Sequence, residues 1–409
     1  MNSQRLWQIA LSILVLIAGF AFGFRGEFYT DALVSAFFGF ALGSVCVIHL
    51  RLFPKLVDAL GLLAGMMVFA AVDFGVLQYA PRFMAWISFL GLSSFMILTL
   101  RLVWARPEDR RICFLAVVPS LLFVSSDWFA STFLQWTEKA HPRVLDLNLL
   151  VLDGSLHVQL PFLLGQAFLQ WPWLKVLSVI AYIALPIPIA IVYSGHLLRS
   201  PSRWLSSMFA FLITGPLGIV FYNIFPAMGP AHIFRTDFPW HPLATSFLSR
   251  LALTPIALPG PRNAIPSLHM AWVLLAMWYS RGLSVVERAI AAFFLIFTVF
   301  ATMGLGEHYF IDLIVAFPFA LFAQALSLYE LPWNNSQRLQ SLSVGLFLTL
   351  GWLGILRFSP KVFLVSVILP WLACTVTVAF CVYLQRSLLR ATKPEPTPAP
   401  AELVPASAS

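Results

Sequence analysis

Two motifs, PGPRNAIPSLHMAW at residues 259–272 and GLGEHYFID at residues 304–312, decide the predicted fold of this chain. A membrane helix needs about 20 apolar residues, with about 17 as a lower limit. The apolar stretch that separates the motifs therefore accommodates two short crossings, which turn at the polar hairpin SRGLSVVER (280–288). Because two crossings return the chain to the side it left, we predict that His269 and His308 lie at the same depth, each near a helix end.

The composition predicts an integral membrane protein. The chain is 60% hydrophobic and 10% charged, whereas soluble proteins carry about 25% charged residues. The net charge is +8, but the sequence contains neither a run of basic residues nor a soluble domain that could present one. We therefore expect no nucleic-acid partner. We predict an all-α, polytopic fold with about twelve membrane helices, which begin near residues 6, 31, 56, 84, 112, 174, 205, 267, 288, 310, 342 and 362.

The distribution of basic residues predicts the orientation. The apolar stretch that ends at Phe24 has no cleavage site of small residues and reads as an uncleaved first span. With a cytoplasmic N-terminus, 15 of the 25 Lys and Arg residues fall on the cytoplasmic side, as the positive-inside rule requires. Two long loops, 137–173 and 226–266, then lie outside together with GLGEHY. Within the first loop, residues 155–173 are amphipathic and too short to span, which predicts an interfacial or re-entrant helix.

His308 and Asp312 are the first candidate catalytic pair. They are four residues apart at the start of a predicted helix, so their side chains share one face. A carboxylate there can accept the proton of one imidazole nitrogen, which leaves the other nitrogen as a nucleophile or base. The alternative is a structural role for both residues. The negative charge of Asp312 would then stabilise the N-terminus of the helix, and His308 would lie at the level of the lipid headgroups.

A second helix start carries groups that bind phosphate. His269 follows Pro266, which suits the first turn of a helix, and Asn263 or Ser267 can cap it. Free backbone N–H groups at such an end bind anions, and the guanidinium of Arg262 matches phosphate oxygens. This set favours phosphoryl transfer without a metal or other cofactor. A zinc site is the competing interpretation of two histidines and an aspartate, although a nearby arginine would repel the cation.

The motifs PSLH and HYFID, in the form RNAIPSLHMAW…GEHYFID, closely resemble the second and third signatures of the type-2 phosphatidic acid phosphatase superfamily, in particular its inositol phosphorylceramide synthase-like branch. The resemblance covers residues 112–329 and implies a six-helix catalytic core. It implies that His308 is a nucleophile that forms a phosphohistidine, that Asp312 orients it, and that His269 is the general acid and base.

The sequence departs from that superfamily at its first motif, where FYNIFPAMGP (221–230) stands, and at Thr302, where the family usually has an arginine. Arg262, with Arg235 as a weaker candidate, is therefore predicted to bind the substrate phosphate together with Ser267. Three further residues are candidates for the headgroup pocket: Asp153, Gly154 and Asp127.

We divide the chain into accessory N-terminal membrane helices (1–111), the catalytic core (112–329), C-terminal membrane helices (330–392) and a disordered cytoplasmic tail (393–409).

The sequence thus predicts a membrane enzyme that cleaves or transfers a phosphate-containing lipid headgroup on the extracytoplasmic side. If water resolves the phosphohistidine, the enzyme is a lipid phosphatase; if a hydroxyl-bearing acceptor does, it is a phosphotransferase. The alternative from another class is a lipid transporter or a scaffold that only binds headgroups. The paired histidines, the aspartate four residues on and the absence of repeats argue against it.

Overall fold

The computed structural model describes residues 3–23, 36–73, 75, 83–199 and 203–392, so the tail predicted at residues 393–409 lies outside it. The described chain is almost entirely helical, which confirms the predicted all-α class. Its elements are α1 (Ser3–Gly23), α2 (Ala36–Leu52), α3 (Leu56–Val72), α4 (Phe83–Trp104), α5 (Pro107–Ala140), β1 (Arg143–Val144), α6 (Asp146–Ser155), α7 (Leu160–Gln170), α8 (Pro172–Ile183), α9 (Pro186–Arg199), α10 (Arg203–Ile224), α11 (Pro230–Phe234), η3 (Arg235–Asp237), α12 (Thr245–Leu248), β2 (Ile256–Ala257), α13 (Leu268–Tyr279), α14 (Val285–Gly304), α15 (Phe310–Ser327), α16 (Ser336–Phe358), η4 (Pro360–Leu364) and α17 (Ile368–Ala391).

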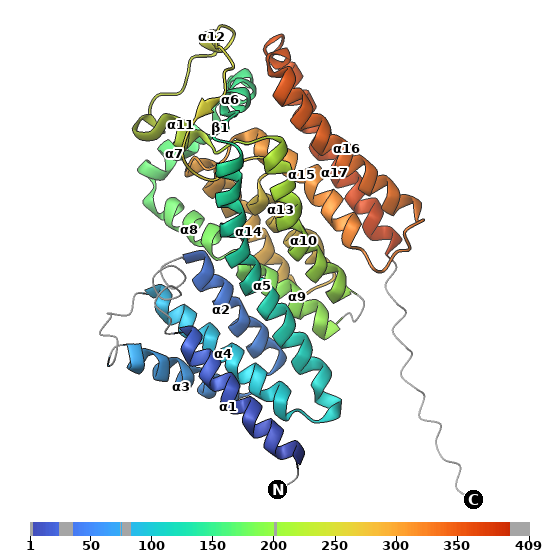
Figure 1. Cartoon of the computed structure of the whole chain (residues 1–409). Helices are drawn as coiled ribbons and strands as arrows, with labels where there is room; N and C mark the ends of the chain where they lie inside the picture. The colour runs from blue at the N-terminus through green and yellow to red at the C-terminus, as the bar shows by residue number, and fades with distance from the viewer. Residues whose placement is uncertain (1–2, 24–35, 74, 76–82, 200–202, 393–409) are drawn as a thin grey trace, which may run out of the picture.

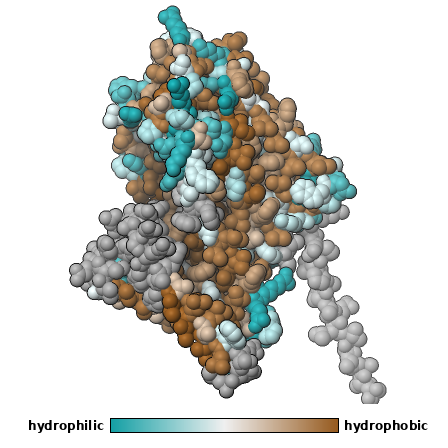
Figure 2. Space-filling view, in the orientation of Figure 1, coloured by the Kyte–Doolittle hydropathy of each residue, from teal (hydrophilic) through white to brown (hydrophobic). Residues whose placement is uncertain are grey.

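Six described helices are long and apolar enough to cross a membrane: α4, α10, α14, α15, α16 and α17. Two bent pairs, α6 with α7 (83°) and α8 with α9 (53°), raise the total to eight if each is one broken span. The predicted twelve spans are not confirmed, because α2, α3 and α13 are apolar but only 17, 17 and 12 residues long. These helices indicate a multi-pass membrane protein. In Figure 2, hydrophobic surface covers the long helices, and hydrophilic residues gather at the end that carries α11 and α12.

The central helix of the C-terminal half is α15. Within its apolar window, 78% of the residues are buried inside the protein, against 33–44% for the other five spans. It packs against α10, α13, α16 and α17, which surround it (Figure 1). A helix enclosed by protein is a rigid support for residues at its end, and α15 begins two residues after His308.

The N-terminal helices pack against this core through α2. Gly91 of α4 lies against the backbone of Leu42, where a Cβ atom would be 2.2 Å from the carbonyl oxygen, so only glycine permits this close approach. At the far end of α2, Arg51 pairs with Glu287 of α14, which also pairs with Arg199 of α9 at 2.8 Å. This ion-pair network joins α2 to two helices of the core.

The two long loops meet at the end of the molecule that carries the histidines. β1 from the first loop and β2 from the second form a two-stranded antiparallel sheet, with Arg143 opposite Ala257. The sharp bend between α6 and α7 lies in the first loop, where the sequence predicts an interfacial or re-entrant helix. The loops therefore form one layer over the ends of α13 and α15.

Candidate active site

His308 lies in the short connection between α14 and α15, and two glycines allow this connection to pack tightly. Gly306 has a φ of +74° and Gly229 a φ of +122°, in the left-handed region that favours glycine. A Cβ on Gly229 would lie 2.3 Å from the carbonyl oxygen of Glu307. The backbone N–H of Ala231 donates to the carbonyl of Gly306 at 2.9 Å. The second long loop thus packs directly against the connection that carries His308.

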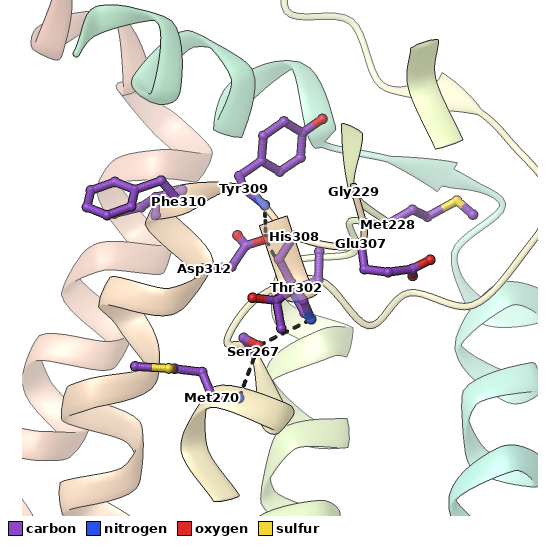
Figure 3. A network of polar contacts seen from close by, with 12 residues as sticks. Met228, Gly229, Ser267, Met270, Thr302, Glu307, His308, Tyr309, Phe310 and Asp312 are labelled. Carbon is purple, nitrogen blue, oxygen red and sulfur yellow. Dashed lines mark hydrogen bonds and ion pairs between the residues drawn. The ribbon is translucent and has the colours of Figure 1, made fainter. Parts of the chain in front are cut away.

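The hydrogen bonds of His308 determine its tautomer (Figure 3). Its Nδ1 lies 2.8 Å from the carbonyl oxygen of Ala264 and 3.5 Å from Oδ2 of Asp312. Because the carbonyl oxygen of Ala264 can only accept, Nδ1 carries the proton of the neutral ring. Nε2 is left with its lone pair, 3.2 Å from the hydroxyl of Ser267, which donates to it. The geometry therefore presents Nε2 as the reactive nitrogen.

The side chain of His308 is 3% exposed. Burial lowers the pKa of His308 to about 4, although the nearby Glu307 and the hydrogen bond to Ala264 act in the opposite direction. A histidine with a lowered pKa is neutral at neutral pH, which a nucleophile requires.

Asp312 belongs to the first turn of α15 and points back toward the connection (Figure 3). Its Oδ2 accepts the backbone N–H of Tyr309 at 2.8 Å. The carboxylate therefore supports the backbone beside His308, whereas the carbonyl of Ala264 makes the shorter contact with Nδ1. The predicted pair is present, but the backbone carbonyl shares the orienting role.

The start of α13 brings the second histidine to the first. Ser267 caps the helix by accepting the backbone N–H of Met270 at 3.4 Å, and its own N–H donates to the carbonyl of Asp312 at 3.2 Å. His269 follows in the first turn, with its ring centroid 6.5 Å from that of His308. The two imidazoles are thus close enough to contact one phosphoryl group from two sides.

Aromatic side chains surround His269. One of them, Trp272, belongs to the same motif, but the motifs do not predict the two that come from distant helices. Tyr182 of α8 stacks on its ring with centroids 3.9 Å apart. Phe37 of α2 and Trp272 of α13 follow at 5.7 Å and 6.2 Å. An N-terminal accessory helix therefore contributes directly to the wall around a candidate catalytic residue.

Two aspartates of α6 hold the backbone around the site. Asp153 accepts the N–H groups of Phe310 at 2.8 Å and Ile311 at 3.2 Å, so it caps α15 from another helix. Asp146 accepts the N–H of Gly229 at 2.8 Å and also contacts that of Met228. Asp153 is thus close to the predicted site. Asp146 was not predicted, although the two aspartates are seven residues apart and share one face of α6.

The other two residues predicted for the headgroup pocket, Gly154 and Asp127, stay predictions. Gly154 faces the side chain of Leu248, where an added Cβ atom would be 2.0 Å from Cδ1. Asp127 belongs to α5, and its side chain lies outside the described residues.

Arg262 is fully buried, and its guanidinium organises the loop. Nε donates to the carbonyl of His141 at 2.7 Å, one terminal nitrogen to that of Leu258 at 2.7 Å, and the other to that of Gly260. In this structure its donors therefore point to backbone oxygens. Arg235 is exposed in η3. The prediction that either arginine binds phosphate stays a prediction.

Glu307 and His232 form a second ionisable pair beside the site. Their Oε2 and Nε2 atoms lie 3.6 Å apart, and each side chain is 35% exposed. The contact with Glu307 raises the pKa of His232. Burial alone would raise the pKa of Glu307, but His232 lowers it. Within the described residues, no group of three or more His, Cys, Asp or Glu side chains is arranged to hold a metal ion.

One comparison with known proteins gives a match. A family model described as the PAP2 superfamily matches residues 147–326, which run from the second residue of α6 to the last but one of α15 and include both histidine motifs. Searches of curated proteins and of solved structures found no match. The match supports the type-2 phosphatidic acid phosphatase superfamily for this part of the chain.

Proposed function

We propose that this protein is a membrane-embedded phosphoryl-transfer enzyme that acts on a phosphate-containing lipid headgroup through a phosphohistidine. The PAP2 superfamily match suggests phosphatase or phosphotransferase activity for residues 147–326. The observation that carries the proposal is the pair of imidazoles 6.5 Å apart, of which His308 has its Nδ1 proton held by a carbonyl.

In the first half of the reaction, the Nε2 lone pair of His308 attacks phosphorus. The bond from phosphorus to the leaving-group oxygen breaks, and that oxygen takes a proton from His269, whose imidazole becomes protonated when the negative charge of the bound phosphate favours its cation. The imidazolium character that develops on His308 is stabilised by the oxygens of Ala264 and Asp312 at Nδ1.

In the second half, His269 accepts a proton from water or from a hydroxyl group. The oxygen of that group attacks phosphorus, the phosphorus–nitrogen bond breaks, and its electron pair returns to Nε2 of His308. Water as acceptor gives a lipid phosphatase. A lipid hydroxyl gives a phosphotransferase, as in the inositol phosphorylceramide synthase-like branch that the motifs resemble.

The phosphate oxygens need donors as negative charge develops. The N-terminus of α13 supplies backbone N–H groups and a favourable dipole next to His269. The hydroxyl of Ser267, which already contacts Nε2 of His308, is a further donor once a substrate displaces that contact.

A lipid fits this site better than a soluble ester. α14 and α15, which flank His308, are membrane-capable helices, and their shared end meets the hydrophilic layer of loops (Figure 2). A reacting phosphate at this level coincides with the headgroup depth of a bilayer, while acyl chains contact the apolar helix surfaces.

A product assay tests the function. The purified full chain in phosphatidylcholine vesicles is given ³²P-labelled phosphatidic acid or phosphatidylinositol, with and without a lipid that carries a free hydroxyl. Labelled water-soluble phosphate indicates hydrolysis, and a new labelled lipid that needs the hydroxyl indicates transfer. The proposal that the protein is an enzyme would be contradicted if neither donor gave a product and His308→Ala bound lipid as well as the parent does. That result would favour a scaffold or a transporter.

We also propose that the site faces the extracytoplasmic side, as the positive-inside count predicts. Ala244 in the second long loop and Ser336 at the start of α16 are both exposed, and the four native cysteines are buried. Ala244→Cys is expected to react with an impermeant thiol reagent in intact cells, whereas Ser336→Cys is not. The reverse labelling pattern would place the site in the cytoplasm.

A further inference from the structure

Four arginines surround one cavity of about 490 Å³ at the end of the protein remote from the histidines. Arg203 begins α10, Arg281 lies in the turn between α13 and α14, and Arg386 and Arg390 lie one turn apart near the end of α17. The first turn of α10 and the last turn of α17 lie at the same end of the molecule (Figure 1). Three segments far apart in sequence thus bring four positive charges together.

The cavity is separate from the candidate active site. α10 runs from Arg203 to Ile224 and has 22 residues, which corresponds to a length of about 33 Å. Its far end leads to Gly229, which packs against the His308 connection. The arginines and the histidines are therefore separated by about the thickness of the apolar core of a bilayer.

In the described part of the chain, the hydrogen-bond partners of these arginines are neutral oxygen atoms. Arg281 donates to the amide oxygen of Gln385 at 2.9 Å, and Arg203 to the carbonyl of Thr392 at 3.3 Å. None of the four forms an ion pair within the described part of the chain. Arg51 and Arg199, by contrast, share the carboxylate of Glu287.

The local electrostatics reflect this imbalance. Burial and then the charge of Arg386 lower the pKa of Arg281. Guanidinium groups that converge without a counter-ion repel one another, and an anion between them removes that repulsion. Arginine forks also match the oxygens of a phosphate group bidentately.

We propose that this cavity, the arginine pocket, binds a phosphate-bearing anion, namely the headgroup of an anionic phospholipid in the leaflet opposite the active site. The lining includes the apolar side chain of Leu389 as well as the arginines. Val285 and Val286, which begin α14 just after the turn, are 70% and 67% exposed. An anionic headgroup in the pocket can thus place its acyl chains against apolar helix surface, as basic pockets between membrane helices do.

Binding there would join the C-terminal helix to the catalytic core. The pocket takes Arg203 and Arg281 from the core helices and their turn, and Arg386 and Arg390 from α17. Because a ligand that binds only the folded state stabilises it, the lipid is expected to raise the melting temperature Tm. The inference does not depend on the reaction at the histidines.

The test compares the full chain in phosphatidylcholine vesicles with and without about one fifth phosphatidylglycerol. The pocket variant is R386Q/R390Q, which removes two charges and breaks no described hydrogen bond. The matched control is R110Q/R111Q, because both of these arginines are exposed at the start of α5, on the same predicted side of the membrane. A third protein, R386K/R390K, keeps the charges and loses the forks.

We expect phosphatidylglycerol to raise the Tm of the parent and of the control by about 2–5 °C. The pocket variant is expected to show little of this rise, and the lysine variant an intermediate one. Native mass spectrometry of detergent-extracted protein is expected to find bound phosphatidylglycerol in the parent but not in the pocket variant.

Three outcomes would overturn the proposal. An equal rise in the pocket variant and the control would show a non-specific surface effect, and no rise in the folded parent would show no anion site. Glycerol 3-phosphate or inorganic phosphate that reproduces the full rise in vesicles of phosphatidylcholine alone would assign the pocket to a soluble phosphate instead of a lipid.

Discussion

The phenol ring of Tyr182 lies flat against the imidazole of His269, with centroids 3.9 Å apart and planes that differ by 17°. Tyr182 is on α8, whereas His269 is on α13, so the stacking fixes the imidazole from a separate helix. Phe37 of α2 packs against both rings, at 5.5 Å from Tyr182 and 5.7 Å from His269. The orientation of the predicted acid thus depends on aromatic packing.

Replacement of Tyr182 tests this dependence. Tyr182→Phe keeps the stacked ring and is expected to retain turnover within about threefold. Tyr182→Leu removes it and is expected to lower kcat about tenfold, since aromatic pairs contribute about 0.5–1.5 kcal/mol and a misplaced acid costs more. The control is Tyr383→Leu, because Tyr383 is 64% exposed on α17. Unchanged kcat in folded Tyr182→Leu would show that the stacking does not position His269.

The two histidines are expected to act as a unit. His308→Ala and His269→Ala should each reduce turnover to background while the protein stays folded in the membrane. Because groups that act in one mechanism are non-additive, the double variant should be little worse than either single variant. Turnover of the labelled lipid, normalised to folded protein, is the measurement. Near-normal turnover in either single variant would remove the phosphohistidine mechanism.

The lowered pKa of His308 gives a prediction about stability and pH. The folded-state pKa is about 4, below the usual 6.5, so the unfolded chain binds more protons between these values. Stability is therefore present above pH 6.5 and is lost as pH falls toward 4. His308→Asn cannot titrate at this position, so the Tm of the parent should fall further over this interval than the Tm of the variant. The difference corresponds to about 1–3 kcal/mol in the free energy of unfolding. A difference between the two proteins that does not change with pH would contradict the assignment.

The motifs allowed much of the site to be predicted from the sequence. A pair of crossings between PSLH and HYFID has to bring its two ends together, and the structure places His269 and His308 side by side. The all-α class followed from composition in the same direct way. Local spacing also gave two candidates, Asn263 and Ser267, for the cap of the helix that carries His269, and the structure has Ser267 there.

Contacts between distant segments were not predictable in this way. The carbonyl of Ala264, which makes the shortest contact with Nδ1 of His308, belongs to the backbone and carries no sequence signal. Phe37 and Tyr182 reach His269 only through the packing of α2 and α8. The predicted number of spans is not confirmed for another reason: hydropathy marks apolar runs, but it does not show that α13 ends after 12 residues.

Arg262 gives the last prediction, because the structure gives it a role that the sequence did not indicate. It is buried, and its guanidinium donates to the carbonyls of His141, Leu258 and Gly260. Arg262→Ala would leave these buried oxygens without a donor, at about 1–3 kcal/mol for each. We expect Tm to fall by several degrees, as measured by thermal unfolding of the purified protein. Arg235→Ala is the control, because this exposed side chain should change stability by less than about 0.5 kcal/mol.

Activity of the same two proteins separates an anchor of the loop from a phosphate ligand. If Arg262 anchors the loop, Arg262→Ala lowers Tm and turnover together. Arg262→Lys should then recover little of either, because an ammonium cannot donate to three separated carbonyls. A phosphate ligand lost from the site would instead lower turnover about 100- to 1000-fold in a protein whose Tm is unchanged. That second pattern would mean that the guanidinium leaves the carbonyls of Leu258 and Gly260 when substrate binds, and would return Arg262 to the active site.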